Sequence, residues 1–399
     1  MITKEFALKL FEGFSIERWN DLIRPIPLLE MDKASEKTML SYIIGKYEEK
    51  EGKKIRWNEI ILFSLFDLLK KIAMCDVKAP VQRMIRREYP DEYKKINKWV
   101  YSQYESLITD GEIKEKFRIF LDSTGEGTSP EYRIFRAAHK YSTFREFEII
   151  KHFNDRSRLT EIEKEIRNDI SEYMDLKGVQ LLMTRQKPYE FLMFIEQLRF
   201  QTRWNQTPRV PKTDVLGHSF FVAILTFLLG RNIDMCEKRI YNNFFSAIFH
   251  DLPEAVTRDI ITPVKKATDN LPEIVKEIED KIVEQELMPT IDDSFKNEIE
   301  YFTNNEFENR IIDSDGKVRF VSFEELNNNF NKNEFSPVDG KIIRASDHIA
   351  AFMEADRSIT HGITSIHLTE GRTNLLKNYP EGESVNGLDI HSFMNSFLI

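Results

Sequence analysis

The sequence predicts an all-α protein with a small β-hairpin, chiefly because of how its apolar residues are spaced. They recur at helical spacing in long windows such as 60–69 and 191–198, and such windows are typical of helices. The main segment typical of a strand is 317–323, which follows the turn-forming residues Asp313-Ser314-Asp315-Gly316. We expect this hairpin to lie in an insertion between helices.

Length and charge narrow the class of protein. The chain has 399 residues, enough for one large or two ordinary domains, and 41% of them are hydrophobic, enough to fill proper cores. Its formal charge is −9 and it has no sustained basic block, which argues against an extended nucleic-acid surface. This charge balance favours a small-molecule substrate.

The sequence also predicts a cytoplasmic protein without a membrane segment. Its two cysteines, Cys75 and Cys236, lie far apart and have neither disulfide nor metal-binding spacing. Residues 1–6 lack the cationic region and apolar core of a signal peptide, and no run of about 18 apolar residues is present. A soluble protein of the reducing cytoplasm is the simplest interpretation.

Four potential metal ligands occur in apolar helical surroundings in the second half of the chain: His218, the doublet His250-Asp251, and Asp347. Burial of such groups is costly unless they are paired or bind a metal. Two imidazoles and two carboxylates make a mixed nitrogen and oxygen site for a divalent cation. We therefore expect a hydrolytic metal site.

The stretch from His250 to Lys265 carries a specific motif, His-Asp-Leu-Pro-Glu-Ala-Val-Thr-Arg-Asp-Ile-Ile-Thr-Pro-Val-Lys. This motif resembles the HD-domain phosphohydrolases, and most closely the 5′-deoxynucleotidases of the YfbR type. The dipeptide Arg203-Trp204, His218 and Asp347 agree with the resemblance, which covers about residues 185–375. Members of that family are compact helical bundles, so the resemblance implies an HD-domain bundle here.

The resemblance makes His218, His250, Asp251 and Asp347 the metal ligands. No histidine occurs between Asp251 and Asp347, whereas HD proteins with two metals usually draw further histidines from that interval. We therefore expect one divalent ion. Manganese, cobalt, iron, nickel, zinc and magnesium all remain compatible with the donor set.

The resemblance also assigns catalytic and substrate-binding residues. It makes Glu254 the acid–base residue, acting beside Asp251. It makes Arg203 the phosphate-binding residue, since a guanidinium suits bidentate contact with an oxyanion, and Trp204 part of the wall that positions it. The remaining substrate-binding candidates are Asp259, for a sugar hydroxyl, Thr262 and Lys265.

The resulting hypothesis is a metal-dependent phosphohydrolase that removes the 5′-phosphate of (deoxy)nucleoside monophosphates by attack of a metal-activated water. One alternative is a nucleotide triphosphohydrolase on the same fold, which would need cations beyond Arg203 and Lys265, such as Arg209, Arg258 and Lys266. The other is a regulatory module that senses a nucleotide and contacts a protein partner. Glu254 favours catalysis, because a pure binder needs no acid–base residue beside the metal.

Landmarks of the second half recur in the same order in the first, which predicts a tandem duplication. The tripeptide Arg18-Trp19-Asn20 stands opposite Arg203-Trp204-Asn205, although it also occurs out of register at 56–58. In this register only Asp67 keeps a ligand type, so the first copy should not bind the metal. The pairs are 33–36 with His218, Phe66-Asp67 with His250-Asp251, Asp76 with Asp259, Ala79-Pro80-Val81 with Thr262-Pro263-Val264, and His139 with Asp347.

We place the boundary at residue 178, with a degenerate HD-like copy at 1–178 and the phosphohydrolase domain at 179–399. An insertion around 303–340 would cover the pocket mouth or form an interface. Because relatives of this type commonly pair two identical domains, the two copies are expected to form a pseudo-dimer within the chain, with a homodimer as the alternative. The first copy would be purely structural or would hold a regulatory nucleotide.

Overall fold

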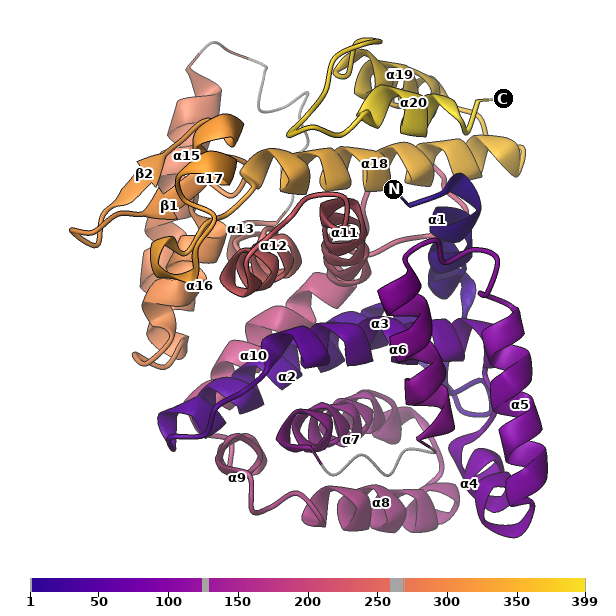
Figure 1. Ribbon diagram of the computed structural model, residues 1–399. Coiled ribbons are helices and arrows are strands. Elements are labelled where there is room, and N and C mark those ends of the chain that lie inside the picture. The colour runs from indigo at the N-terminus through magenta and orange to yellow at the C-terminus, as the bar shows by residue number, and fades with distance from the viewer. Residues whose placement is uncertain (1, 124–128, 259–267, 269, 399) are drawn as a thin grey trace.

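The computed structural model describes residues 2–123, 129–258, 268 and 270–398, which form a helical protein with one hairpin (Figure 1). The first half contains α1 (Lys4–Phe11), α2 (Glu30–Lys50), α3 (Trp57–Met74), α4 (Ala79–Glu88), α5 (Pro90–Ser102), α6 (Gly111–Asp122), α7 (Pro130–Ile150), α8 (Arg156–Ser171) and α9 (Lys177–Met183). The second half contains α10 (Lys187–Gln197), α11 (Val215–Gly230), α12 (Glu237–Phe249), α13 (Glu254–Thr257), α15 (Leu271–Ile282), α16 (Lys296–Thr303), β1 (Arg310–Ile312), β2 (Val318–Phe320), α17 (Phe323–Asn328), α18 (Gly340–Thr360), α19 (Ile366–Lys377) and α20 (Ile390–Asn395). The all-α prediction is confirmed.

The β-hairpin lies where the sequence predicts it, with Arg310 opposite Phe320 and Ile312 opposite Val318 in an antiparallel pair. The Asp313 carboxylate accepts the backbone N–H groups of Asp315 and Lys317, which closes the turn. Gly316 has a φ of +76°, a conformation that glycine adopts without a steric penalty.

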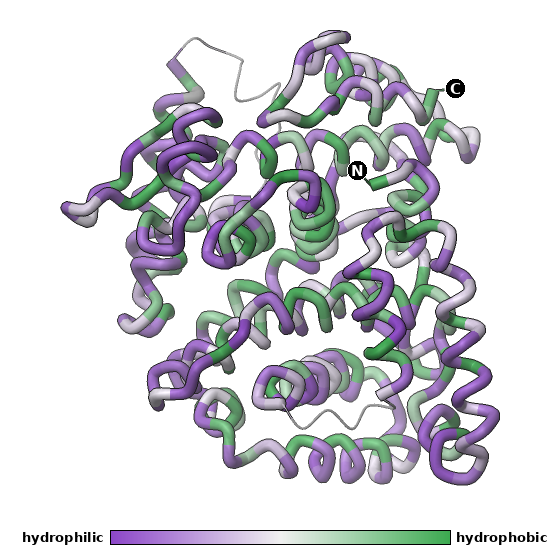
Figure 2. Tube along the Cα trace, in the orientation of Figure 1, coloured by the Kyte–Doolittle hydropathy of each residue, from purple (hydrophilic) through white to green (hydrophobic). Residues whose placement is uncertain are grey.

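Two helices, α2 and α11, lie side by side in the middle of the molecule (Figure 1). The first packs against α3 and α7, and the second against α12 and α18. Every residue of α11 is buried, as expected for a helix that is apolar on all sides, and Figure 2 shows this helix as a hydrophobic segment at the centre. None of the helices in the described ranges is long and apolar enough to cross a membrane.

Helix α2 is buried along most of its length although it carries many charged residues. Three of these charges have partners from other segments. Arg18 contacts Glu30 at 2.6 Å, Arg199 contacts Glu36, and Lys37 contacts Asp67. A buried charge of this kind is tolerated only with such a partner.

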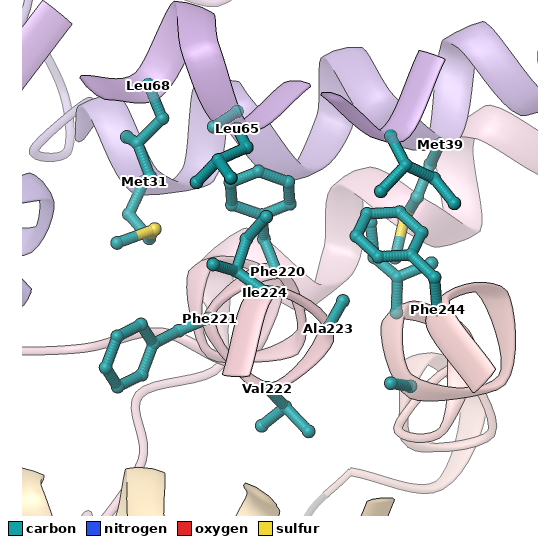
Figure 3. Packing of buried hydrophobic residues seen from close by; sticks show 14 of the residues in the cluster. Met31, Met39, Leu65, Leu68, Phe220, Phe221, Val222, Ala223, Ile224 and Phe244 are labelled. Atoms are coloured by element: carbon teal, nitrogen blue, oxygen red, sulfur yellow. The ribbon is translucent and has the colours of Figure 1, made fainter. Parts of the chain in front are cut away.

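The hydrophobic core is continuous between the two halves of the chain. Figure 3 shows Phe220 and Ile224 of α11 facing Leu65 of α3, with Met31 and Leu68 beside them. Because one core joins both halves, the boundary at residue 178 remains a prediction.

Contacts between the halves join counterpart positions of the sequence repeat. Asp32 and Gly217 are counterparts, and a Cβ on Gly217 would lie 2.6 Å from the Asp32 Oδ1 atom. The Phe14 and Phe221 rings are 5.7 Å apart, and the counterparts of these positions are the ion-paired Arg199 and Glu36. These contacts follow the register of the predicted repeat, and the tandem duplication itself stays a prediction.

Candidate metal centre

The four predicted metal ligands come from segments that pack around α11. His218 lies in the first turn of α11, His250 and Asp251 directly follow α12, and Asp347 lies in the first half of α18. Since α11 contacts both α12 and α18, the packing brings the three segments together.

The side chains of these four residues converge. One donor atom each from His218, His250 and Asp347 lies within 4.8 Å of the other two. The Asp251 Oδ1 atom is 3.2 Å from His250 Nε2, and its Oδ2 atom is 4.0 Å from His218 Nε2. The structure therefore brings His218, His250 and Asp347 together around one point, with the Asp251 carboxylate beside the two imidazoles.

The donor atoms at this point fit a divalent cation. His250 Nδ1 donates to the Ala247 carbonyl at 2.7 Å, which leaves Nε2 facing the centre. Among the described residues, neither His250 Nε2 nor Asp251 Oδ2 has a hydrogen-bond partner, although both atoms are buried. Imidazole nitrogens fixed by a backbone carbonyl and combined with carboxylates are a typical ligand set for such ions.

A fully buried carboxylate, Glu354, lies behind the centre. It accepts the indole N–H of Trp204 and the hydroxyl of Thr213, both at 2.8 Å, and its Oε1 atom is 3.4 Å from His218 Nδ1. Burial opposes its ionisation, but the charges of Arg203 and Arg209 outweigh burial and hold its pKa well below the ordinary value. Glu354 is therefore a charged anchor that orients His218 from the side opposite the metal.

Arg203 lies between this anchor and the metal ligands. Its Nε atom is 3.3 Å from Glu354 Oε2, whereas its Nη1 and Nη2 atoms are 3.6 Å from Asp251 Oδ2 and 3.9 Å from Asp347 Oδ1. The last two distances exceed hydrogen-bond length, so the terminal N–H groups remain available to an oxyanion beside the metal ligands. The sequence predicts this role for Arg203.

Trp204 has a structural role in addition to the predicted one. Its φ is +56°, and its ring lies against Gly371 of α19, where a Cβ would come within 2.6 Å of the Cη2 atom. The shared acceptor Glu354 and the tight contact with α19 hold the backbone next to Arg203 in one conformation.

Comparison with known proteins concerns the segment that carries these residues. Residues 195–376, just under half of the chain, match the family model described as HD domain. This segment is an HD domain. A curated relative, the 4′-phosphooxetanocin A phosphatase of Priestia megaterium, is 36% identical over 78 residues, which are 19% of this chain and 40% of the relative. An HD-domain phosphohydrolase of Listeria innocua matches 53% of this chain and 87% of its own at 18% identity, with a TM-score of 0.39.

Glu254, the predicted acid–base residue, is the first residue of α13 in the HD domain. It is half-buried, and its negative charge acts on the Arg203 guanidinium. The other predicted substrate-binding residues, Asp259, Thr262 and Lys265, lie outside the described residues, so their roles remain predictions.

The start of the predicted insertion lies beside the candidate metal centre. The Phe307 ring lies 6.1 Å from the His250 ring, and the Arg344 guanidinium lies 5.7 Å above Phe307. Burial raises the pKa of the neighbouring Glu306, and the charge of Asp251 adds to this effect. The start of the insertion therefore forms part of the wall around the metal centre.

Glu354 was not predicted from the sequence. One signal for it is present, because it lies seven residues after Asp347, as Glu146 lies seven residues after His139.

Proposed function

We propose that this protein is a metal-dependent phosphohydrolase that removes the 5′-phosphate of nucleoside monophosphates, with deoxynucleotides as the preferred class. The observation that carries this proposal is the position of Arg203. Its Nε atom is held by Glu354, while both terminal nitrogens face the carboxylates of Asp251 and Asp347. A phosphate there would contact a cationic fork on one side and the ligand set on the other.

His218, His250, Asp251 and Asp347 would hold the ion. When bound, a divalent cation supplies Lewis acidity, which makes water a competent nucleophile near neutral pH. Arg203 would neutralise charge on the equatorial phosphoryl oxygens as the phosphorus is attacked. Glu354 would keep the guanidinium in place throughout, because it is buried and bonded to three other groups.

Glu254 would move the proton in this reaction. It follows Asp251 by three residues and is the first residue of the short helix α13. A carboxylate in that position would take a proton from the attacking water or deliver one to the leaving 5′-oxygen, a role worth about a hundredfold to ten-thousandfold in rate. The products would be a nucleoside and orthophosphate.

The alternative of a triphosphohydrolase has less support from the described residues. Among them, Arg203 is the only arginine or lysine with a nitrogen within ion-pair distance of Asp251 or Asp347. Arg209 is buried and donates to Thr213, so its charge serves Glu354. A monophosphate needs fewer cationic partners than a triphosphate, and the monophosphate is therefore the favoured substrate.

The test is orthophosphate release from a panel of ribonucleoside and deoxyribonucleoside mono- and triphosphates, with metal-stripped protein supplemented by manganese, cobalt or magnesium. The proposal predicts release from deoxynucleoside monophosphates and little from triphosphates. Release from triphosphates alone would establish the alternative enzyme. Metal and nucleotide binding without release from any compound would favour the nucleotide-sensing module.

A further inference from the structure

A second site candidate lies in the first half of the chain, away from the HD domain. A cavity of about 690 Å³ opens between α3, α4, α7 and α8, and its wall includes Asp67 and His139. In the register of the sequence repeat these two residues stand opposite the metal ligands Asp251 and Asp347. The volume falls in the range of small-molecule sites, roughly 300–1,000 Å³.

Each half of the chain has a buried glutamate that binds a neighbouring arginine and tryptophan, and we call this group of three residues the frame. Glu146 accepts the indole N–H of Trp19 at 2.9 Å and Arg18 Nε at 3.0 Å, as Glu354 does with Trp204 and Arg203. Trp19 also has a positive φ, +58°. In both halves one antiparallel bridge links the residue before the arginine to the residue before the long central helix, Glu17 with Leu29 and Thr202 with Asp214.

Lysines occupy the positions where the second half has metal ligands. Lys33, the counterpart of His218, lies 3.6 Å from Glu146 Oε2, and Lys37 is paired with Asp67. Ammonium groups at these positions repel a metal ion. The two halves therefore differ at the counterpart positions. The HD domain has candidate ligands for a cation there, whereas the first half has lysines and a positively charged cavity.

Several cations on the cavity wall lack an acidic partner in the described part of the chain. Lys70 is one, but its ammonium group donates to Tyr93 and Asn97. Lys71 and Arg136 have no carboxylate within ion-pair distance among the described residues, whereas Lys140 is paired with Asp169 at 2.5 Å. Burial lowers the pKa of Lys71, as expected for an ammonium group without a close counter-charge.

His139, which also lines the cavity, lies in the electric field of the same positive charges. Its Nδ1 atom is buried without a hydrogen-bond partner in the described part of the chain. Burial and the charges of Arg136 and Lys33 hold its pKa well below the ordinary value. Among the described residues, Lys71 and Arg136 thus leave positive charge in this cavity beside the unpartnered His139 Nδ1 atom, and an anionic ligand would neutralise that charge.

We propose that this cavity binds an organic phosphate of nucleotide size without hydrolysing it. Lys71 and Arg136 would contact the phosphoryl oxygens, with the planar guanidinium giving a bidentate contact. Tyr132 and Tyr173, which line the same cavity, would pack against the organic part of the ligand, as aromatic rings do with nucleobases. The proposal is independent of the reaction assigned to the HD domain.

The test is calorimetric titration of the full chain with ATP in the presence of EDTA, which removes metal from the HD domain. Saturable binding with a Kd below about 1 mM is expected, and adenosine should not bind. Lys71→Gln and Arg136→Gln should each weaken ATP binding about tenfold or more, the usual effect of losing a charge-assisted contact. Lys94→Gln, on the exposed surface of α5, is the matched control and should bind normally.

Site assignment and folding are checked with two further measurements. Binding should survive in Arg203→Gln, because that residue belongs to the HD domain. The ligand-free Lys71→Gln protein should unfold at the wild-type temperature or above, since burial disfavours its ammonium group. The ligand-free Arg136→Gln protein should keep the wild-type circular dichroism spectrum. No saturable binding of ATP, equal binding of adenosine, loss of ATP binding in Arg203→Gln alone, or full retention in both cavity variants would each overturn the proposal.

Discussion

The indole N–H of Trp204 donates to Glu354 at 2.8 Å, and this bond fixes the segment that carries Arg203. The same carboxylate lies 3.4 Å from the imidazole of His218, a proposed metal ligand. One buried anion thus supports both the proposed phosphate-binding group and a metal ligand.

Replacement of Glu354 by glutamine is expected to weaken metal binding about 10-fold to 100-fold, the usual effect of losing a partner of a ligating histidine. The measurement is competition for manganese or cobalt with a chelator. Glu146→Gln is the matched control, because Glu146 supports Arg18 and Trp19 in the same way but lies in the first half. Equal loss of metal affinity in both variants would show that the effect is a general loss of stability.

Replacement of Glu254 by glutamine should lower kcat by about a hundredfold to ten-thousandfold, because the amide cannot transfer the proton. Metal content and nucleotide affinity should remain close to wild type, since Glu254 is not one of the four ligands. Steady-state kinetics with metal analysis checks both expectations. Wild-type turnover in this variant would remove Glu254 from the mechanism.

Lys33 should make stability depend on pH in the alkaline range. Burial lowers its pKa from 10.5 to about 7, against the attraction of Glu146, so between these values the folded protein holds fewer protons than the unfolded chain. Its contribution to stability therefore rises with pH across that window and is most unfavourable below it. Lys33→Met should be more stable than wild type near pH 7, with the difference shrinking towards pH 10.5. Urea denaturation at several pH values tests this, and a difference that grows with pH would contradict it.

Gly217→Ala should destabilise the protein by about 1–3 kcal/mol, the usual cost of overpacking. The new Cβ would lie 2.6 Å from Asp32 Oδ1 and 3.1 Å from the Phe14 ring, at the contact between the two halves. Gly111→Ala is the control, because no atom lies within 4 Å of its added Cβ, and its stability should stay unchanged or rise by up to about 1 kcal/mol. Equal stability of the two variants would show that the packing of α2 against α11 is loose.

The helices, and the grouping of three of the predicted ligand residues, were predictable from the sequence because their signals are local. His218 and His250 stand within apolar helical windows, and the hairpin follows a recognisable turn. Trp204 was predicted only in part, because its contact with Gly371 joins segments far apart in the chain.

The charged interior was not predictable from local pattern. Residues such as Glu36 and Glu354 resemble solvated helix positions in the sequence, yet both are buried. Their burial depends on partners such as Arg199 and Trp204, which only the tertiary packing brings close. The contact of Phe307 with His250 likewise joins segments far apart in the chain, so no local pattern predicts it.

The central claim is that the four converging ligands form a metal site for phosphate-ester hydrolysis. Its most direct test is orthophosphate release from a deoxynucleoside monophosphate as metal is titrated into metal-stripped protein. We expect about one equivalent of metal to restore phosphate release. The Asp251→Asn variant should release no phosphate, whereas the counterpart variant Asp67→Asn should remain active. Metal-independent release, or equal activity in Asp251→Asn and wild type, would contradict it.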